Sequence, residues 1–252
     1  MSTEGVVVVI PARFASSRFP GKPLAEINGT PMIIHVFQRV IEAVPPFQVL
    51  VATDDQRISD TCYEAGVRVV MTPSSCLTGT DRIWKAVQNI NAEIVVNVQG
   101  DEPLVDPATI LAVIEAKKEN PDCVVNAMSR INDAKSVKNP NVPKVLVDRN
   151  ARLLYMSRAV VPYAASGATI PTYFRQVCVY AFDKAELGAF AKHDGKSRLE
   201  EPEDIEILRF LDLGIPVKMV EVQPSSIAVD TPEDLVRVEG ILAGRNESNS
   251  SA

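Results

Sequence analysis

Five consecutive β-branched apolar residues, 6–10, place the strongest constraint on how this 252-residue chain can fold. A run of this kind is typical of a strand buried on both faces, as in a parallel sheet. Further strand-like runs lie at 47–53, 67–71 and 93–98. Helical patterns separate them at 31–43, at a segment ending at 65, at 80–90 and at 106–119. This β-α-β-α order predicts a parallel sheet with helices on both faces.

The pattern changes in the second half of the chain. Strand-like runs lie close together at 124–128, 144–147, 153–156 and 174–182. They predict a partly antiparallel insertion over about 124–180 rather than further βαβ units. Helices are expected at 183–192 and about 203–213, a strand at 216–222, and a last helix capped by Asp230 or Thr231.

The domain organisation follows from the absence of repeats and obvious linkers in the sequence. We expect one domain over residues 1–245, with the strand-rich insertion inside it. Residues 246–252 are polar and rich in serine, so we expect them to form a frayed tail.

Composition excludes several classes of function. The net charge of −6 and the isoelectric point of about 5.1 disfavour nucleic-acid and membrane-surface binding, which need a basic face. No apolar stretch approaches ~20 residues, so we expect no membrane-spanning helix. The first residues do not resemble a signal peptide, so we expect none. The four scattered cysteines predict reduced thiols in a cytoplasmic protein. His35 and His193 lack the spacing of zinc ligands.

The loop at 11–24 follows the first predicted strand, where open α/β sheets bind ligands. It carries Arg13, Arg18 and Lys22, together with serines, a glycine and their backbone N–H groups. Fixed cations and N–H donors suit a polyphosphate, although a solvated basic loop is the alternative. Neither the P-loop motif nor Gly-x-Gly-x-x-Gly is present, which disfavours P-loop NTPases and dinucleotide dehydrogenases.

Two aspartates are candidates for binding Mg²⁺. Asp101 follows the predicted strand at 93–98, and Asp230 lies between the last predicted strand and the last helix. Both are expected at the crevice that holds the phosphate loop, where carboxylates and substrate phosphates together bind this hard cation. The alternatives are that Asp101 is a turn residue and that Asp230 is a helix N-cap.

Two further segments are candidates for a base or ribose pocket. Thr53 and Asp54 end the second predicted strand, and residues 75–82 open a helix. Helix capping alone explains Thr78 or Thr80 equally well.

Taken together, the motifs resemble the 3-deoxy-manno-octulosonate (Kdo) cytidylyltransferases, or CMP-Kdo synthetases. The matching segments follow one another over nearly the whole chain: 11–24, 28–33, 51–54, 79–82, 97–103, 139–141, 144–145, 154–158 and 229–234. The first motif is shared with other sugar nucleotidyltransferases, whereas the full series is specific.

The resemblance implies a Rossmann-like, three-layer α/β fold of the nucleotide-diphospho-sugar transferase type. It also implies a homodimer formed through the insertion. The implied reaction is CTP plus Kdo giving CMP-Kdo plus diphosphate, with Mg²⁺ as cofactor, for lipopolysaccharide biosynthesis in the cytoplasm.

The resemblance also implies roles for individual residues. The implied catalytic residues are Lys22, Arg18, Asp101 and Asp230, and the last two would hold Mg²⁺. The implied nucleotide-binding residues are Pro11, Ala12, Arg13, Ser17, Arg18, Lys22, Thr53, Asp54, Thr78, Gly79, Gln99 and Asp101. The implied sugar-binding residues are Gln99, Arg158, Gln176, Tyr180 and Glu206. In-line phosphoryl transfer needs little covalent participation from the protein. Substrate positioning and charge stabilisation would therefore dominate catalysis.

Two positions depart from the family pattern on the sugar side. Gln176 stands where family members commonly carry a histidine, and Ile207 stands where a glutamine is usual. A cytidylyltransferase for a modified Kdo or another 2-keto-3-deoxy sugar acid is therefore an alternative, because lost polar contacts can change which substrate is accepted. Two other readings stay open: a nucleotidyltransferase with another nucleotide or a sugar phosphate, and a non-catalytic nucleotide-binding protein.

Overall fold

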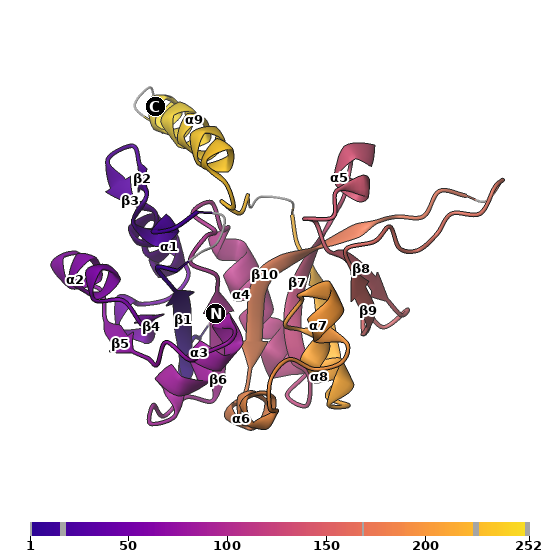
Figure 1. Ribbon diagram of the computed structural model, residues 1–252, viewed down its shortest axis with the longest axis horizontal. Coiled ribbons are helices and arrows are strands. Elements are labelled where there is room, and N and C mark those ends of the chain that lie inside the picture. Colours follow the sequence, from indigo (N-terminus) through magenta and orange to yellow (C-terminus); the bar gives the residue numbers. More distant parts are fainter. Residues whose placement is uncertain (1, 16–18, 168, 224–226, 250–252) are drawn as a thin grey trace.

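The computed structural model describes residues 2–15, 19–167, 169–223 and 227–249, with the side chains of the last helix described up to residue 244. It is a three-layer α/β structure around one twisted sheet (Figure 1). The strands of the sheet are β1 (Val6–Ala12), β4 (Val49–Thr53), β5 (Val69–Met71), β6 (Ile94–Val98), β7 (Val124–Arg130), β8 (Lys144–Val147), β9 (Leu153–Ser157), β10 (Phe174–Phe182) and β11 (Val217–Glu221). A separate hairpin pairs β2 (Glu26–Ile27) with β3 (Thr30–Pro31).

The main path of the sheet runs β11-β7-β10-β6-β1-β4-β5, with β8 beside β10 and β9 beside β8. Strands β6, β1, β4 and β5 are mutually parallel, whereas β10 is antiparallel to both β6 and β7. Strand β8 pairs antiparallel with β10 and with β9. The α/β class, the parallel first half and the partly antiparallel second half are thus confirmed.

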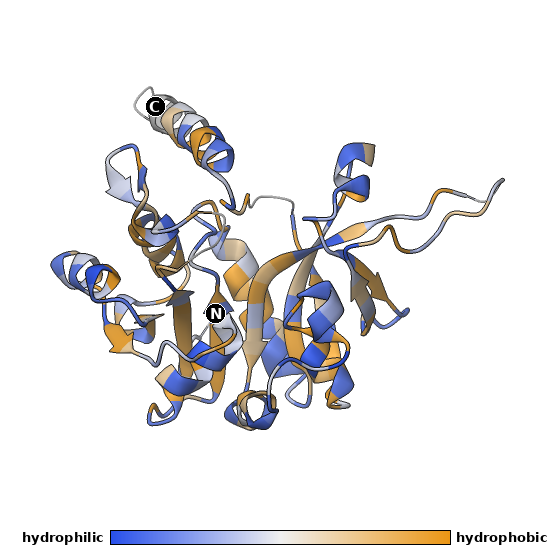
Figure 2. Ribbon diagram, in the orientation of Figure 1, coloured by the Kyte–Doolittle hydropathy of each residue, from blue (hydrophilic) through white to orange (hydrophobic). Residues whose placement is uncertain are grey.

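The helices are α1 (Met32–Ile41), α2 (Gln56–Glu64), α3 (Gly79–Val87), α4 (Pro107–Glu119), α5 (Ala134–Lys138), α6 (Lys184–Lys192), α7 (Glu200–Glu203), α8 (Leu208–Asp212) and α9 (Pro232–Asn249). The apolar faces of α1, α2 and α4 cover one face of the sheet, and those of α3, α6 and α8 cover the other. In β1, Val8 and Ile10 pack on the first face and Val7 and Val9 on the second. This double burial explains the unbroken apolar run, and Figure 2 shows the central strands as largely hydrophobic.

The prediction of one helix is wrong. The segment at 203–213 does not form a continuous helix, because Asp204 adopts a left-handed conformation with φ of 52° and separates α7 from α8. At the C-terminus, α9 extends to Asn249 and so enters the segment for which a frayed tail was expected. None of the helices in the described residues is long and apolar enough to cross a membrane.

Candidate functional site

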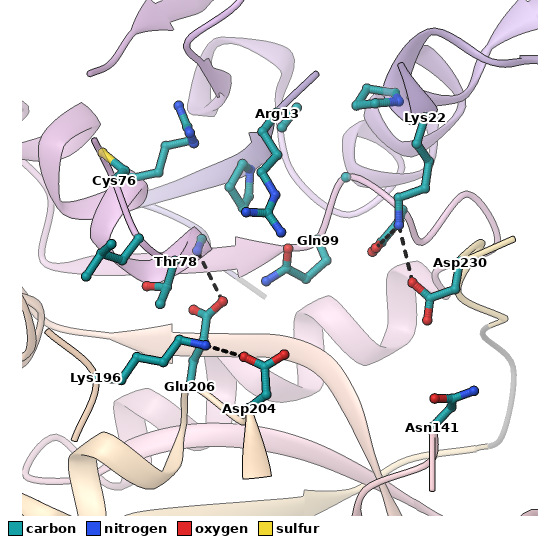
Figure 3. Close-up of a pocket in the computed structure, with 18 of the residues that line it drawn as sticks. Arg13, Lys22, Cys76, Thr78, Gln99, Asn141, Lys196, Asp204, Glu206 and Asp230 are labelled. Carbon is teal, nitrogen blue, oxygen red and sulfur yellow. Dashed lines mark hydrogen bonds and ion pairs between the residues drawn. The ribbon is translucent and has the colours of Figure 1, made fainter. Parts of the chain in front are cut away.

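A cavity of about 660 Å³ lies at the carboxyl ends of β1 and β6 (Figure 3). A second hollow, of about 840 Å³, opens beside it over β10. The two are lined in common by Gln99, Asp101, Asn141, Arg158, Asp204, Glu206 and Asp230. The site therefore has two connected compartments.

Glycine permits the close packing of the strand ends that form the floor of the first cavity. A Cβ atom on Gly100, after β6, would lie 2.8 Å from the backbone oxygen of Pro11 at the end of β1. A Cβ atom on Gly79 would lie 3.2 Å from the side-chain nitrogen of Gln99. Pro11, Ala12, Gly79 and Gln99, four of the predicted nucleotide-binding residues, all line the first cavity.

Lys22 joins the two aspartates that the sequence singles out. Its Nζ donates to Asp101 Oδ2 at 2.7 Å and lies 3.4 Å from Asp230 Oδ1. Lys22 begins a short 3-10 helix (Lys22–Leu24) after β1, Asp101 lies in the loop after β6, and Asp230 lies in the segment before α9. Figure 3 shows Lys22 and Asp230 directed toward each other. Two carboxylate oxygens that converge on one cation form a fitting donor pair for Mg²⁺. In the part of the chain that the structure describes, no group of three or more His, Cys, Asp or Glu side chains gathers as a metal centre. Phosphate and water oxygens would have to complete the coordination.

Residues other than Asp230 cap the N-terminus of α9. Thr231 Oγ1 accepts from the backbone N–H of Asp234, and Asp234 Oδ2 accepts from the backbone N–H of Thr231. Thr231 and Asp234 therefore cap α9, and the Asp230 side chain is directed to Lys22 instead.

Arg13 and Arg158 both line the first cavity, together with the ion pair of Lys196 and Asp204. Lys196 holds the pKa of Asp204 below its usual range, with smaller contributions from Arg158 and Arg13. Arg13, Arg158 and Lys196 thus provide positive charge for an anionic ligand in this compartment. Ser17 and Arg18, two further predicted phosphate ligands, lie outside the described residues.

Glu206 binds the N-terminus of α3. Its carboxylate accepts hydrogen bonds from Gly79 N at 3.1 Å, Thr80 N at 2.9 Å and Thr80 Oγ1 at 2.6 Å. The N-terminus of a helix favours an anion, so these contacts fix the position of the helix. Glu206 lines both cavities and thus connects the wall of the first to the wall of the second.

The remaining predicted sugar-binding residues, Gln176 and Tyr180, line the second cavity. They lie on one face of β10, and Gln176 Nε2 is 3.0 Å from the Tyr180 hydroxyl. Burial raises the pKa of Tyr180 well above its usual value, so this hydroxyl stays neutral. Burial also raises the pKa of the adjacent Glu102 to about 8, with Asp101 adding to the shift.

Thr53 and Asp54 do not line either cavity. Thr53 is fully buried, and its hydroxyl accepts from the backbone N–H of Asp55. Asp54 forms an ion pair at 2.9 Å with Arg82 of α3. The structure therefore gives both residues contacts within the fold. Thr78 does line the first cavity, but its hydroxyl forms a capping box with Asp81.

Several residues of the site were not singled out from the sequence. Lys196 and Asp204 line the first cavity, and Glu102 and Arg175 line the second. Asn126, in β7, accepts a hydrogen bond from Gln176 Nε2. A polar residue inside the apolar run at 124–128 was the one available signal for Asn126.

The chain matches the cytidylyltransferase family model over residues 7–217. The 3-deoxy-manno-octulosonate cytidylyltransferase of Syntrophus aciditrophicus is 39% identical over 246 residues, which cover 96% of this chain and 99% of the relative. The enzyme of the same name from Syntrophotalea carbinolica is 42% identical, with 95% and 99% covered. The chain belongs to the 3-deoxy-manno-octulosonate cytidylyltransferase family.

Solved structures agree with this assignment. A CMP:2-keto-3-deoxy-manno-octonic acid synthetase complexed with CTP has a TM-score of 0.89 and 34% identity, covering 95% of this chain and 99% of that one. A 4-diphosphocytidyl-2C-methyl-D-erythritol synthase from Anaerococcus prevotii has a TM-score of 0.62 at 17% identity and shares the fold. The chain is therefore a nucleotidyltransferase, as expected from its motifs.

Proposed function

We propose that this protein transfers a cytidylyl group from CTP to Kdo, giving CMP-Kdo and diphosphate, with Mg²⁺ as cofactor. The observation that carries the proposal is the convergence of Asp101, Asp230 and Lys22 where two connected cavities meet. The first cavity carries Arg13 and Lys22 of the phosphate loop, and the second carries the predicted sugar-binding residues Gln176 and Tyr180. Similarity to a CTP-bound synthetase supports the choice of nucleotide.

The reaction forms one P–O bond and breaks another. The anomeric hydroxyl oxygen of the sugar acid attacks the α-phosphorus of CTP, its proton is released, and diphosphate leaves with the electrons of the broken bond. Arg13 and Lys22 would neutralise negative charge on the phosphates, and Gln99 lines both cavities. Mg²⁺, held by Asp101 and Asp230, would supply further charge neutralisation and lower the pKa of the attacking hydroxyl.

The decisive experiment measures diphosphate release with CTP and Mg²⁺ in the presence of Kdo, of other 2-keto sugar acids, or of no acceptor. We expect release with Kdo and rejection of UTP and ATP. Release with a different sugar acid alone would keep cytidylyl transfer and replace the acceptor. No release with any acceptor would overturn the proposal.

The metal role is tested with Asp101→Asn, which keeps the side-chain size but removes the negative charge. We expect kcat to fall by at least ~100-fold while the circular dichroism spectrum stays unchanged, because charge stabilisation at the reacting phosphates is lost. Asp122→Asn, at an exposed position in the loop after α4, is the matched control and should keep full activity. Near-normal turnover of Asp101→Asn would rule out this role.

We further propose a homodimer formed through the β8–β10 region, and a cytoplasmic location. The segment between β9 and β10 extends away from the body of the molecule (Figure 1), and Tyr163 and Ile170 on it are 86% and 81% exposed. Exposed apolar side chains on a projecting arm favour a protein partner. The four cysteines are free, which fits a reducing compartment.

A further inference from the structure

The sugar-side compartment contains a polar relay of three side chains whose hydrogen-bond directions are fixed by the backbone. The three side chains are Asn126, Gln176 and Tyr180, and they lie next to an irregularity in β10. The β10–β7 pairing shifts register between Val177 and Tyr180, whose partners Ala127 and Asn126 are adjacent in β7. The intervening residues of β10 are therefore displaced from the regular ladder with β7.

Asn126 satisfies the carbonyl groups at this irregularity. Its Nδ2 donates to Val177 O at 2.8 Å and to Val179 O at 3.0 Å, and the side chain is fully buried. A carbonyl oxygen can only accept, so the amide nitrogen of Asn126 must face the backbone. The opposite rotamer would place Oδ1 against two other acceptors.

The orientation of Asn126 determines that of Gln176. With its nitrogen turned to the backbone, Asn126 presents Oδ1, which accepts from Gln176 Nε2 at 3.1 Å. The second Nε2 hydrogen is directed to the Tyr180 hydroxyl at 3.0 Å. Both N–H donors of Gln176 are thereby used within the protein.

The remaining polar atom of Gln176 is its Oε1, and no described residue donates a hydrogen bond to it. Gln176 is half-buried and lines the second cavity. The relay thus offers an acceptor, and not a donor or a cation, to whatever binds there. An acceptor attracts a hydroxyl group and repels a carboxylate, which has no hydrogen to donate.

We propose that Gln176 Oε1 is a specificity determinant that accepts a hydrogen bond from a hydroxyl group of the sugar acid, and that Asn126 is the positioning residue that fixes this polarity. This inference rests on the proposed function, because it assigns the sugar acid to the second cavity. The carboxylate of the sugar acid then binds away from Gln176 Oε1. Arg158 and Arg175 line the same cavity and provide cations for it.

The experiment compares Kdo with analogues in which each hydroxyl in turn is replaced by hydrogen or by fluorine. For one hydroxyl, both replacements should lower kcat/KM by about tenfold or more, because neither hydrogen nor fluorine can donate to Oε1. A fluorine analogue that keeps the activity of the parent while the deoxy analogue loses it would show that Gln176 donates, and would overturn the inference.

Variants locate the effect. Gln176→Leu should raise the KM for the sugar acid about tenfold, leave the KM for CTP within about twofold, and lose the discrimination at that one hydroxyl. Asn126→Ala should weaken the same discrimination, again without a change in the KM for CTP. Asn120→Ala is the control, since Asn120 Nδ2 also donates to a backbone carbonyl but lies at the end of α4. Gln176 is on the cavity wall, so Gln176→Leu carries the test if Asn126→Ala does not fold.

The outcomes separate the two proposals. If the unmodified protein releases no diphosphate with any 2-keto-3-deoxy sugar acid, the proposed function fails and this inference falls with it. If the protein is active and Gln176→Leu keeps both the KM for the sugar acid and the discrimination, the inference alone is overturned. Unchanged discrimination in folded Asn126→Ala would remove the positioning role.

Discussion

At the scale of the residue, position along a strand was predictable but side-chain partners were not. Asp101 and Asp230 were expected at the carboxyl edge of the sheet, and the structure brings both to Lys22. Asp54 was expected there for the same reason, yet it pairs with Arg82 of α3. Nothing in the spacing of the sequence shows that an arginine of the neighbouring helix reaches this aspartate.

Cys76 provides a chemical test of the first cavity at this scale. It lines the cavity and is half-buried, and burial raises the pKa of its thiol above the usual value. Because the thiolate is the reactive form, a raised pKa means that iodoacetamide labelling is slow near neutrality and accelerates about tenfold per pH unit through pH 8 to 9. We expect CTP to protect Cys76, as measured by mass spectrometry of the labelled peptide.

Cys62 is the internal control for this labelling. It is fully buried, and burial raises the pKa of its thiol to about 12. It should stay unlabelled in the folded protein over the same pH range. Faster labelling of Cys62 than of Cys76, or labelling of Cys76 that CTP leaves unchanged, would contradict the assignment of the cavity.

At the scale of the element, the break between α7 and α8 shows what a local pattern cannot predict. The apolar spacing at 203–213 is helical, but Arg158 Nε donates to Glu203 O at 2.5 Å and Arg158 Nη2 to Asp204 O at 3.2 Å. These carbonyls are thus bound by an arginine from the end of β9, a contact distant in sequence. The break places Glu206 at the N-terminus of α3.

The contact of Glu206 with α3 can be tested by Glu206→Gln. We expect a loss of about 1–2 kcal/mol in the free energy of unfolding, because a neutral amide interacts less with the helix N-terminus and can offer only one acceptor oxygen. This corresponds to a fall in Tm of roughly 2–8 °C. The KM for CTP should rise as well, since Gly79 forms part of the nucleotide cavity.

Glu201→Gln is the matched control, because Glu201 is an exposed residue of α7. Its unfolding free energy should stay within about 0.5 kcal/mol of the unmodified protein, as is usual for surface substitutions. Equal stability of the Glu206 and Glu201 variants in denaturant titrations would show that the carboxylate does not hold the helix.

At the scale of the whole molecule, the apolar runs predicted the strands and the layers well, because burial on both faces leaves a direct signature in the sequence. The antiparallel character of the second half was also predictable, from the close succession of strands. Their order in the sheet was not: β10 lies between β6 and β7, and β11 beside β7. Such pairings join segments far apart in the chain, and only tertiary packing decides them.

The proposed dimer can be tested at the arm between β9 and β10. Tyr163 and Ile170 are exposed on the arm between β9 and β10, although both are large and Ile170 is apolar. Replacement of both by aspartate, Tyr163→Asp with Ile170→Asp, puts charges where two copies would bury the arm. Since an unpaired buried charge strongly opposes association, we expect the variant to sediment as a monomer and the unmodified protein as a dimer.

Tyr63→Asp is the control, because Tyr63 is 80% exposed on α2, away from the arm. It should leave the dimer intact, whereas a double variant that still sediments as a dimer would place the interface elsewhere.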